Sequence, residues 1–129
     1  MFKRQLLRTA LLALLPWMAT PGHAQSDFPN KPIRFIVGYA AGGPTDVIAR
    51  MVAQEISGPL GQSVVVENRA GANGNIATEF VAGSPADGYT LIVNTLSHNV
   101  NAILGQGRVK YDPEKDFAPI SLAVVLPQY

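Results

Sequence analysis

The residues that could do chemistry lie in three loops, and each loop follows a short apolar segment. The loops span residues 39–46, 68–75 and 95–101 and are rich in Gly, Ser, Thr and Asn. Glycines at a strand-to-helix turn let the backbone approach a ligand, and the free N–H groups of a helix N-terminus favour an anion. The first loop therefore suits a carboxylate or a phosphate. A tight structural turn without a ligand is an equal alternative from this loop alone.

Two charged side chains in these loops have structural roles as alternatives to ligand binding. Asp46 falls in the first turn of a predicted helix, where a carboxylate caps free N–H groups. We expect this capping role, since a carboxylate repels an anion placed close to it. Arg69 has the geometry to clamp a carboxylate with two nitrogens. Pairing with the nearby Glu67, or packing on the surface, is the favoured alternative.

The third loop contains Thr95, Ser97 and His98, and a hydrolase would use Ser97 as nucleophile and His98 as base. Adjacent residues rarely present their side chains to one another in this way, and no Gly-x-Ser-x-Gly elbow surrounds Ser97. The only other histidine is His23, so a metal site built from several histidines is not expected. Hydrogen-bonding hydroxyls at a binding cleft are the better interpretation.

Composition and missing motifs exclude further classes of function. The chain has 129 residues with 10 Lys+Arg, 9 Asp+Glu, no Cys and a formal net charge of +1. This balance offers no basic surface for nucleic acid, and without Cys there is no disulfide framework or thiol nucleophile. No lysine follows either glycine cluster as a P-loop requires, and Gly71 and Gly74 lack the Rossmann spacing. We therefore expect no cofactor and no metal.

Residues 1–24 have the layout of a secretory signal peptide. Lys3, Arg4 and Arg8 precede an apolar run, and the segment ends in small residues that place a cut after Ala24. Prolines interrupt the apolar run well before the ~20 residues that a membrane span needs. Removal of this leader changes the net charge from +1 to −2. We expect a periplasmic protein.

The remaining chain alternates strand-like and helix-like segments. Short apolar, β-branched runs predict strands, and apolar positions at helical spacing predict helices. The predicted elements are strand 33–37, helix 44–57 (ended by Gly58, Pro59 and Gly61), strand 64–66, helix 75–82, strand 89–94, a short helical segment at 102–104 and strand 120–126. This order predicts an α/β fold with an open parallel sheet and right-handed crossovers. Ligands of such sheets bind at the carboxyl ends of the strands, where the three loops lie.

Five runs, from about residue 28 to the end, together resemble the Bug family, the periplasmic solute receptors of tripartite tricarboxylate transporters. They are Pro32-Ile33-Arg34, Ala41-Gly42-Gly43-Pro44-Thr45-Asp46, Val65-Val66-Glu67-Asn68-Arg69, Asp87-Gly88-Tyr89-Thr90-Leu91, and Tyr111-Asp112-Pro113 with Asp116-Phe117-Ala118-Pro119-Ile120-Ser121. The resemblance implies a type II periplasmic binding protein, in which two lobes close on a small carboxylate. Residues 25–129 would be an incomplete first lobe that ends at the start of a strand crossing between lobes.

The resemblance also implies a ligand, partners and a site. The ligand is a tricarboxylate, a dicarboxylate or an acidic amino acid, held largely by main-chain groups and water, and the partners are integral membrane transporter subunits. The implied ligand-binding residues are Tyr39, Ala40, Gly42, Gly43 and Thr45 in the first loop, Gly71, Ala72, Asn73 and Gly74 in the second, and Thr95, Ser97 and His98 in the third. Ala70 and Asn73 depart from the family's usual Pro and Gly.

The resulting hypothesis is a non-enzymatic, extracytoplasmic receptor for small carboxylates. A periplasmic sensor that relays solute occupancy to a signalling partner is an alternative that the sequence does not separate from transport. A periplasmic α/β hydrolase that uses Ser97 is a weaker one. A truncated chain that neither folds stably nor binds is a further alternative.

Overall fold

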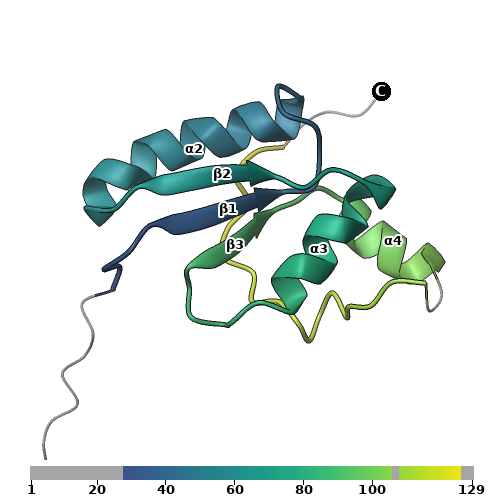
Figure 1. The fold of residues 1–129 in the computed structure, drawn as a ribbon. Coiled ribbons are helices and arrows are strands. Elements are labelled where there is room, and N and C mark those ends of the chain that lie inside the picture. The colour runs from purple at the N-terminus through teal and green to yellow at the C-terminus, as the bar shows by residue number, and fades with distance from the viewer. Residues whose placement is uncertain (1–27, 106–107, 126–129) are drawn as a thin grey trace, which may run out of the picture.

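The fold is a three-stranded parallel sheet with helices on both faces (Figure 1). The computed structural model describes residues 28–105 and 108–125. Strands β1 (Ile33–Val37), β2 (Val64–Asn68) and β3 (Thr90–Val93) lie in the order β2-β1-β3. Both pairings are parallel, with Phe35 of β1 opposite Val66 of β2 and Leu91 of β3. The predicted open parallel sheet is confirmed.

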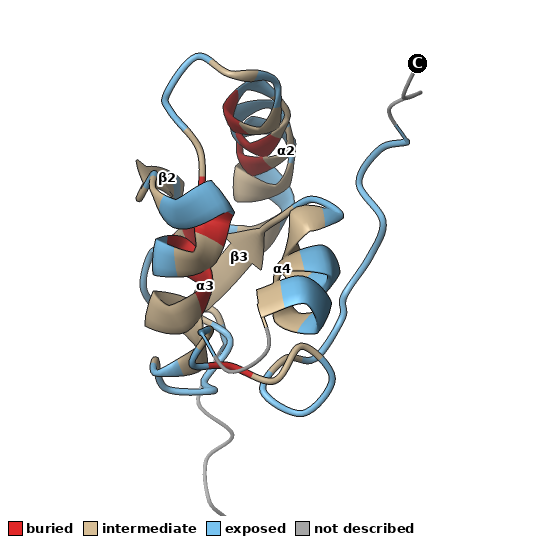
Figure 2. Cartoon of the chain, turned by 90° about the vertical axis from the view of Figure 1, so that its right-hand side faces the viewer, coloured by how far each residue is buried: buried red, intermediate tan, exposed pale blue. Residues whose placement is uncertain are grey.

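The strand order explains why the sheet is covered on both faces. Helix α2 (Pro44–Leu60) connects β1 to β2, and helix α3 (Asn75–Ala82) leads from β2 back past β1 to β3. Crossovers between parallel strands are right-handed as a rule, and two such crossovers that run in opposite directions along the sheet place their helices on opposite faces. Figure 2 shows α2 and α3 on opposite sides of the sheet, each with buried residues on its inner side.

The core between the sheet and α2 is built from alternate residues of the strands. Ile33 and Phe35 of β1 and Ala53 of α2 are nearly fully buried. Partly buried apolar residues packed against them are Val52, Ile56, Leu60, Val64, Val66, Tyr89, Leu91 and Val93. Burial of these side chains stabilises the fold by about 25 cal/mol for each Å² of apolar surface removed from water.

Several element boundaries differ from those that the sequence predicts. Helix α2 continues through Gly58 and Pro59 and ends at Leu60, where Gly61 takes a left-handed φ of 64° and its N–H bonds the carbonyl of Gly58. The φ of proline is fixed near the helical value, so Pro59 can lie in the last turn of α2 at the cost of one backbone hydrogen bond, and the helix ends one residue later. Helix α3 has the predicted bounds. Strand β2 extends two residues further than predicted, and β3 is shorter by one residue at each end.

The third loop is shorter than predicted, because α4 (Ser97–Gly105) begins within it. Residues 95–101 were expected as a polar loop before a short helical segment at 102–104. The hydroxyl of Thr95 accepts the N–H of Ser97, and the N–H of His98 bonds the Thr95 carbonyl, which starts the helix early. None of the α4 residues is fully buried (Figure 2).

The predicted strand at 120–126 is wrong for its described part. Residues 120–125 are extended coil with exposed side chains, including Ile120 and Leu122 at 76% and 77% exposure. A strand needs a hydrogen-bonded neighbour, and an apolar β-branched run alone does not supply one. The leader at 1–24 lies outside the described residues. Among the helices of the described part, none has the length and apolar character to cross a membrane.

Candidate functional site

The loops that follow the three strands meet at one edge of the sheet. The hydroxyl oxygens of Tyr39 and Thr95 lie 2.7 Å apart, which joins the loop after β1 to the loop after β3. A Cβ added to Gly38 would stand 2.8 Å from the Cα of Gly74, so the loop after β2 lies directly against the first. The crossovers reverse direction at β1, and the loops at such a reversal leave a crevice between them.

The first loop is held by Asp46, whose side chain is 2% exposed. Its carboxylate accepts the N–H of Gly42 at 2.8 Å, Nε of Arg50 at 2.9 Å and Nδ2 of Asn68 at 2.9 Å. These bonds, that of Arg50 above all, lower the pKa of Asp46 to about 2. Asp46 lies in the first turn of α2 as predicted, but its carboxylate bonds the N–H of Gly42 before the helix and does not cap a free N–H group of α2 itself. Its charge is balanced by Arg50 and is not available to a ligand.

The first loop nevertheless leaves main-chain donors at the N-terminus of α2. The Gly43 N–H bonds the carbonyl of Ala40, and Asp46 takes up the Gly42 N–H. The N–H groups of Ala40 and Thr45 form no hydrogen bond with another described residue. Gly42 takes a left-handed φ of 81°, which an L side chain rarely adopts. The loop is therefore a preformed turn with free donors.

The second loop has an unusual backbone. Gly71, Ala72, Asn73 and Gly74 all have positive φ, at 139°, 46°, 54° and 90°. Such a φ is strained for alanine, less so for asparagine, and strain of this kind clusters at functional sites. Residues Ala72–Gly74 form a short 3₁₀ turn, η2, directly before α3. Gly74 is buried against the hydroxyl of Tyr39.

The Asn73 side chain turns toward α4. Its Nδ2 donates to Oδ1 of Asn101 at 3.0 Å, and Nδ2 of Asn101 donates to the Asn73 carbonyl and to Oδ1 of Asn75. Asparagine tolerates the left-handed φ that this position requires, so the departure from the family's usual glycine is accommodated. The asparagine joins the second loop to α4.

The third loop carries a chain of hydroxyl groups. The hydroxyl of Thr95 donates a hydrogen bond to Oγ of Ser97 at 3.1 Å. Because its proton is used in this bond, Oγ1 of Thr95 accepts the hydrogen bond from the Tyr39 hydroxyl. This leaves the Ser97 hydroxyl proton free to bond a further acceptor. The arrangement brings the side chains of Tyr39, Thr95 and Ser97 together.

His98 points away from Ser97. Its Nδ1 lies 3.0 Å from Nδ2 of Asn94, and its ring is stacked on Tyr111 and meets Phe117 edge-on. A nucleophile needs its base within hydrogen-bond reach. The bonds of Ser97 and His98 go to different partners, so these two residues do not form the pair that a hydrolase requires.

Arg69 lies outside the cluster of loop donors. Its guanidinium stands 3.7 Å over the ring of Phe80 and its Nη2 is 3.9 Å from the Glu67 carboxylate. Glu67 is bonded twice by Arg34, at 2.6 and 2.7 Å, and this lowers the pKa of Glu67. The favoured alternative for Arg69, pairing with Glu67, is confirmed.

Some positioning residues of this edge were not predicted from the sequence. Asn68 bonds both Asp46 and the carbonyl of Tyr39, and Asn94 bonds Thr78, His98 and the N–H of Thr95. Both asparagines stand at or just after the carboxyl end of an apolar strand. A polar amide at that place is the signal that could have identified them.

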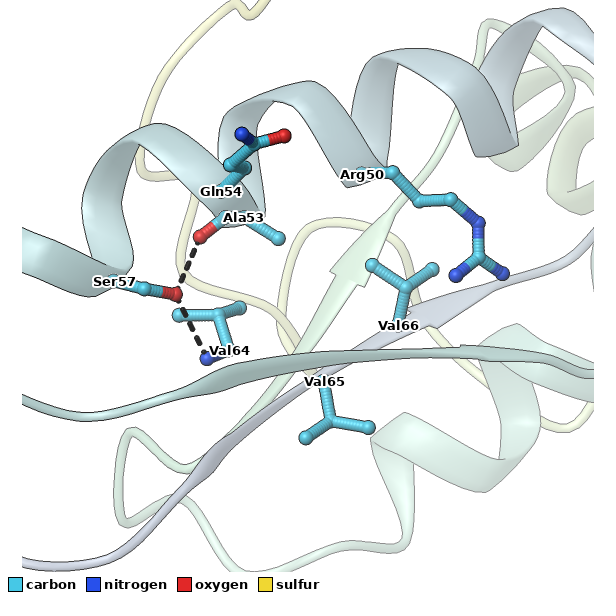
Figure 3. Close-up of a pocket in the computed structure, with 7 residues that line it drawn as sticks. All are labelled: Arg50, Ala53, Gln54, Ser57, Val64, Val65 and Val66. Atoms are coloured by element: carbon cyan, nitrogen blue, oxygen red, sulfur yellow. Dashed lines mark hydrogen bonds between the residues drawn. The ribbon is translucent and has the colours of Figure 1, made fainter.

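An open groove of about 400 Å³ lies elsewhere, between α2 and the edge strand β2 (Figure 3). In it the Ser57 hydroxyl donates to the Ala53 carbonyl and accepts the N–H of Val64. Val64 and Val66 point toward α2, and Val65 points to the other face (Figure 3). The residues described contain no cluster of three His, Cys, Asp or Glu that could hold a metal ion.

The comparisons with known proteins agree with this geometry. Residues 48–128, more than half of the chain, match the family model "Tripartite tricarboxylate transporter family receptor". A UPF0065 protein of Bordetella bronchiseptica is 42% identical over 95% of this chain and 37% of its own length. BugT of Bordetella pertussis is 40% identical over 92% of this chain and 38% of its own length. The chain thus spans less than two fifths of these relatives.

Solved structures share the fold at substantial identity. MatC of Rhodopseudomonas palustris, with bound malate, is 40% identical with a TM-score of 0.70, over 74% of this chain and 33% of MatC. A periplasmic transporter is 47% identical with a TM-score of 0.66, over 68% of this chain and 30% of the other. An R. palustris protein with adipate is 44% identical with a TM-score of 0.54, and the match covers 55% of this chain and 24% of the R. palustris protein.

The family match and the shared fold lead to one conclusion. The family match spans residues 48–128, which include most of α2 and the elements from β2 to α4, and the MatC fold covers 74% of the chain. The chain belongs to the receptor family of the tripartite tricarboxylate transporters.

Proposed function

We propose that this chain supplies one wall of a binding site for a small carboxylate in an extracytoplasmic solute receptor. The observation that carries the proposal is the meeting of three loops with unused N–H and O–H donors at the carboxyl edge of the sheet. Two proteins that share the fold were solved with dicarboxylates, malate and adipate. A carboxylate accepts several hydrogen bonds at once, and helix N-termini favour its charge.

The charges around the loops favour an anion that is bound without a salt bridge. Asp46 is balanced by Arg50, and Arg69 stacks on Phe80. The donors offered are therefore the main chain of Ala40 and Thr45 and the hydroxyl of Ser97. Preformed donors hold an oxyanion without reorganisation, so they bind it well even without a charged partner.

The family match supports a proposal for the role of the whole protein. We infer a periplasmic receptor that delivers its solute to membrane subunits of a tripartite transporter, with the second half of the cleft supplied by a second lobe. A leader at residues 1–24, cut after Ala24, accounts for export. Residues 25–129 form part of the first lobe in this proposal. The binding role needs no catalytic residue.

Heteronuclear NMR of the chain tests the binding role, because it detects weak binding by one wall of a cleft. Malate, adipate and citrate are titrated to millimolar concentration against the ¹⁵N-labelled chain, and the neutral diamide of malate serves as the matched control. We expect the N–H signals of Ala40, Thr45 and Ser97 to shift with the acids and not with the diamide. Equal shifts with acid and diamide, or none with any acid, contradict the proposal.

A pair of serine variants localises the site. Ser97→Ala removes the free hydroxyl donor and is expected to weaken binding by about 2- to 10-fold, the equivalent of one hydrogen bond. Ser84→Ala is the matched control, since Ser84 bonds the Phe80 carbonyl at the end of α3, remote from the loops. Equal weakening by both variants would place the carboxylate elsewhere.

A further inference from the structure

His98 is built into a cluster that we call the aromatic clasp, formed by the rings of His98, Tyr111 and Phe117. The His98 ring lies parallel to Tyr111 with centroids 5.3 Å apart and edge-on to Phe117 at 4.7 Å. Tyr111 is 7% exposed, and its hydroxyl donates to the carbonyl of His98 at 2.9 Å. The clasp thus joins the segment after α4 to the first turn of α4.

The hydrogen bonds of Asn94 determine the protonation state of His98. Oδ1 of Asn94 accepts the N–H of Thr95 at 2.9 Å, so Nδ2 is the atom that faces His98 Nδ1, at 3.0 Å. An amide NH₂ only donates, and Nδ1 must therefore be an unprotonated acceptor. The same Nδ2 donates to Oγ1 of Thr78, whose own proton goes to the Gly74 carbonyl.

Asn94 thereby connects the clasp to all three loops. It bonds Thr95, whose hydroxyl bonds Tyr39 in the loop after β1, and through Thr78 it reaches Gly74 in the loop after β2. A protonated His98 would present an N–H to an NH₂ group. Asn94 would then lose its bond to His98, or turn over and lose its bond to Thr95.

We propose that neutral His98 is a positioning residue of the carboxylate site, that it acts through Asn94 on the loops after β1, β2 and β3, and that protonation of His98 releases this arrangement. The inference rests on the proposed carboxylate function. It replaces direct contact between His98 and the ligand by an indirect role, and it makes solute binding sensitive to acid.

The charges around the clasp agree with a neutral imidazole. Burial lowers the pKa of His98, and the Pro113 carbonyl opposes this only in part. The other titratable groups on the elements packed around the ring are Tyr39, Glu79 on α3, Arg108 and Lys110 just before Tyr111, Tyr111 itself with a pKa raised by burial, and the charged run from Asp112 to Asp116. Within that run, the carboxylate of Asp112 bonds Lys115 and that of Asp116 bonds the Asp112 N–H. α4 carries no titratable side chain besides that of His98.

NMR titration of the chain between pH 8 and 4 tests the coupling without a ligand. His98→Gln assigns the imidazole signal, which distinguishes it from that of His23. We expect a His98 pKa below 6.5, and N–H signals of Thr95 and Gly74 that move with the same midpoint. In His98→Gln, which keeps an acceptor for Asn94 but has no proton to gain, these movements should disappear. Signals that move alike in both proteins overturn the inference.

Malate titrations of both proteins at several pH values test the effect on binding. Below the His98 pKa we expect the affinity of the unaltered chain to fall by up to about 10-fold per pH unit relative to His98→Gln. Because the affinity of the unaltered chain is divided by that of His98→Gln at each pH, the effect of malate's own titration cancels. Identical profiles for the two proteins overturn the inference. Absence of malate binding at every pH would instead overturn the proposed function. The role of His98 would then be decided by whether the Thr95 and Gly74 N–H signals share the pH midpoint of the His98 ring.

Discussion

Gly38 and Gly74 are so close that a Cβ on Gly38 would stand 2.8 Å from the Cα of Gly74 and 3.3 Å from its carbonyl oxygen. Both neighbours are backbone atoms, which cannot rotate away as a flexible side chain does. The approach fixes the loop after β1 against the turn that starts α3. The meeting of the loops therefore depends on two missing side chains, 36 positions apart in the chain.

Gly38→Ala is expected to destabilise the chain by about 1–3 kcal/mol, the usual cost of overpacking, and to displace the loop after β2. Gly58→Ala is the matched control, because a Cβ there meets nothing within 4 Å and alanine favours the helix by about 0.5–1 kcal/mol. Urea unfolding followed by circular dichroism measures both changes. A Gly38→Ala chain as stable as the parent would show that the loops are not in close contact.

Tyr39→Phe removes the hydroxyl that bonds Thr95 and leaves the ring. We expect the loops after β1 and β3 to separate and the affinity for malate to fall by about 2- to 10-fold, as for one hydrogen bond. Tyr89→Phe is the control, since its hydroxyl bonds Asn30 at the opposite end of the sheet. The measurement is NMR titration, and a larger effect from Tyr89→Phe would contradict the assignment of the site.

Asp46 should determine part of the acid sensitivity of the fold. Its pKa is lowered from 3.8 to about 2 in the folded chain, mainly by Arg50. Its stabilisation is therefore complete above pH 3.8 and is lost as the pH falls toward 2. Asp46→Asn, which has no proton to gain, should be less stable than the parent at neutral pH.

Thermal unfolding of both proteins between pH 7 and 2 measures this contribution. The difference in midpoint between parent and Asp46→Asn is expected to shrink across the window from pH 3.8 to 2. A difference that stays constant through that window would mean that Asp46 is not held by its partners in the folded chain.

Ala72→Gly should be neutral or stabilising by up to about 1 kcal/mol, because Ala72 has a φ of 46°, which is strained for alanine and freely adopted by glycine. Ala77→Gly is the opposite case. Ala77 is fully buried within α3, and glycine there should destabilise by about 1 kcal/mol or more. Denaturant unfolding compares the two, and a destabilising Ala72→Gly would contradict the positive φ.

The fold was predictable where local pattern and packing agree. The strand at 33–37 and the helix at 75–82 have the predicted bounds, because apolar periodicity and flanking glycines both mark them. The prediction of a strand at 120–126 is wrong over 120–125, where the chain is coil, because an apolar pattern alone does not supply a neighbouring strand to pair with. Helix α4 was underestimated, because the hydroxyl of Thr95 starts it within a polar sequence.

The sequence by itself determined the parallel α/β sheet, the glycine loops at its carboxyl edge and the absence of cysteine chemistry, since these follow from periodicity, residue type and handed crossovers. Only the tertiary structure decided which donors are free. Asp46 takes up the Gly42 N–H, and Asn94 directs His98 away from the loops and toward the clasp. Bonds between residues distant in the chain depend on how loops pack, and residue spacing along the chain does not encode that packing.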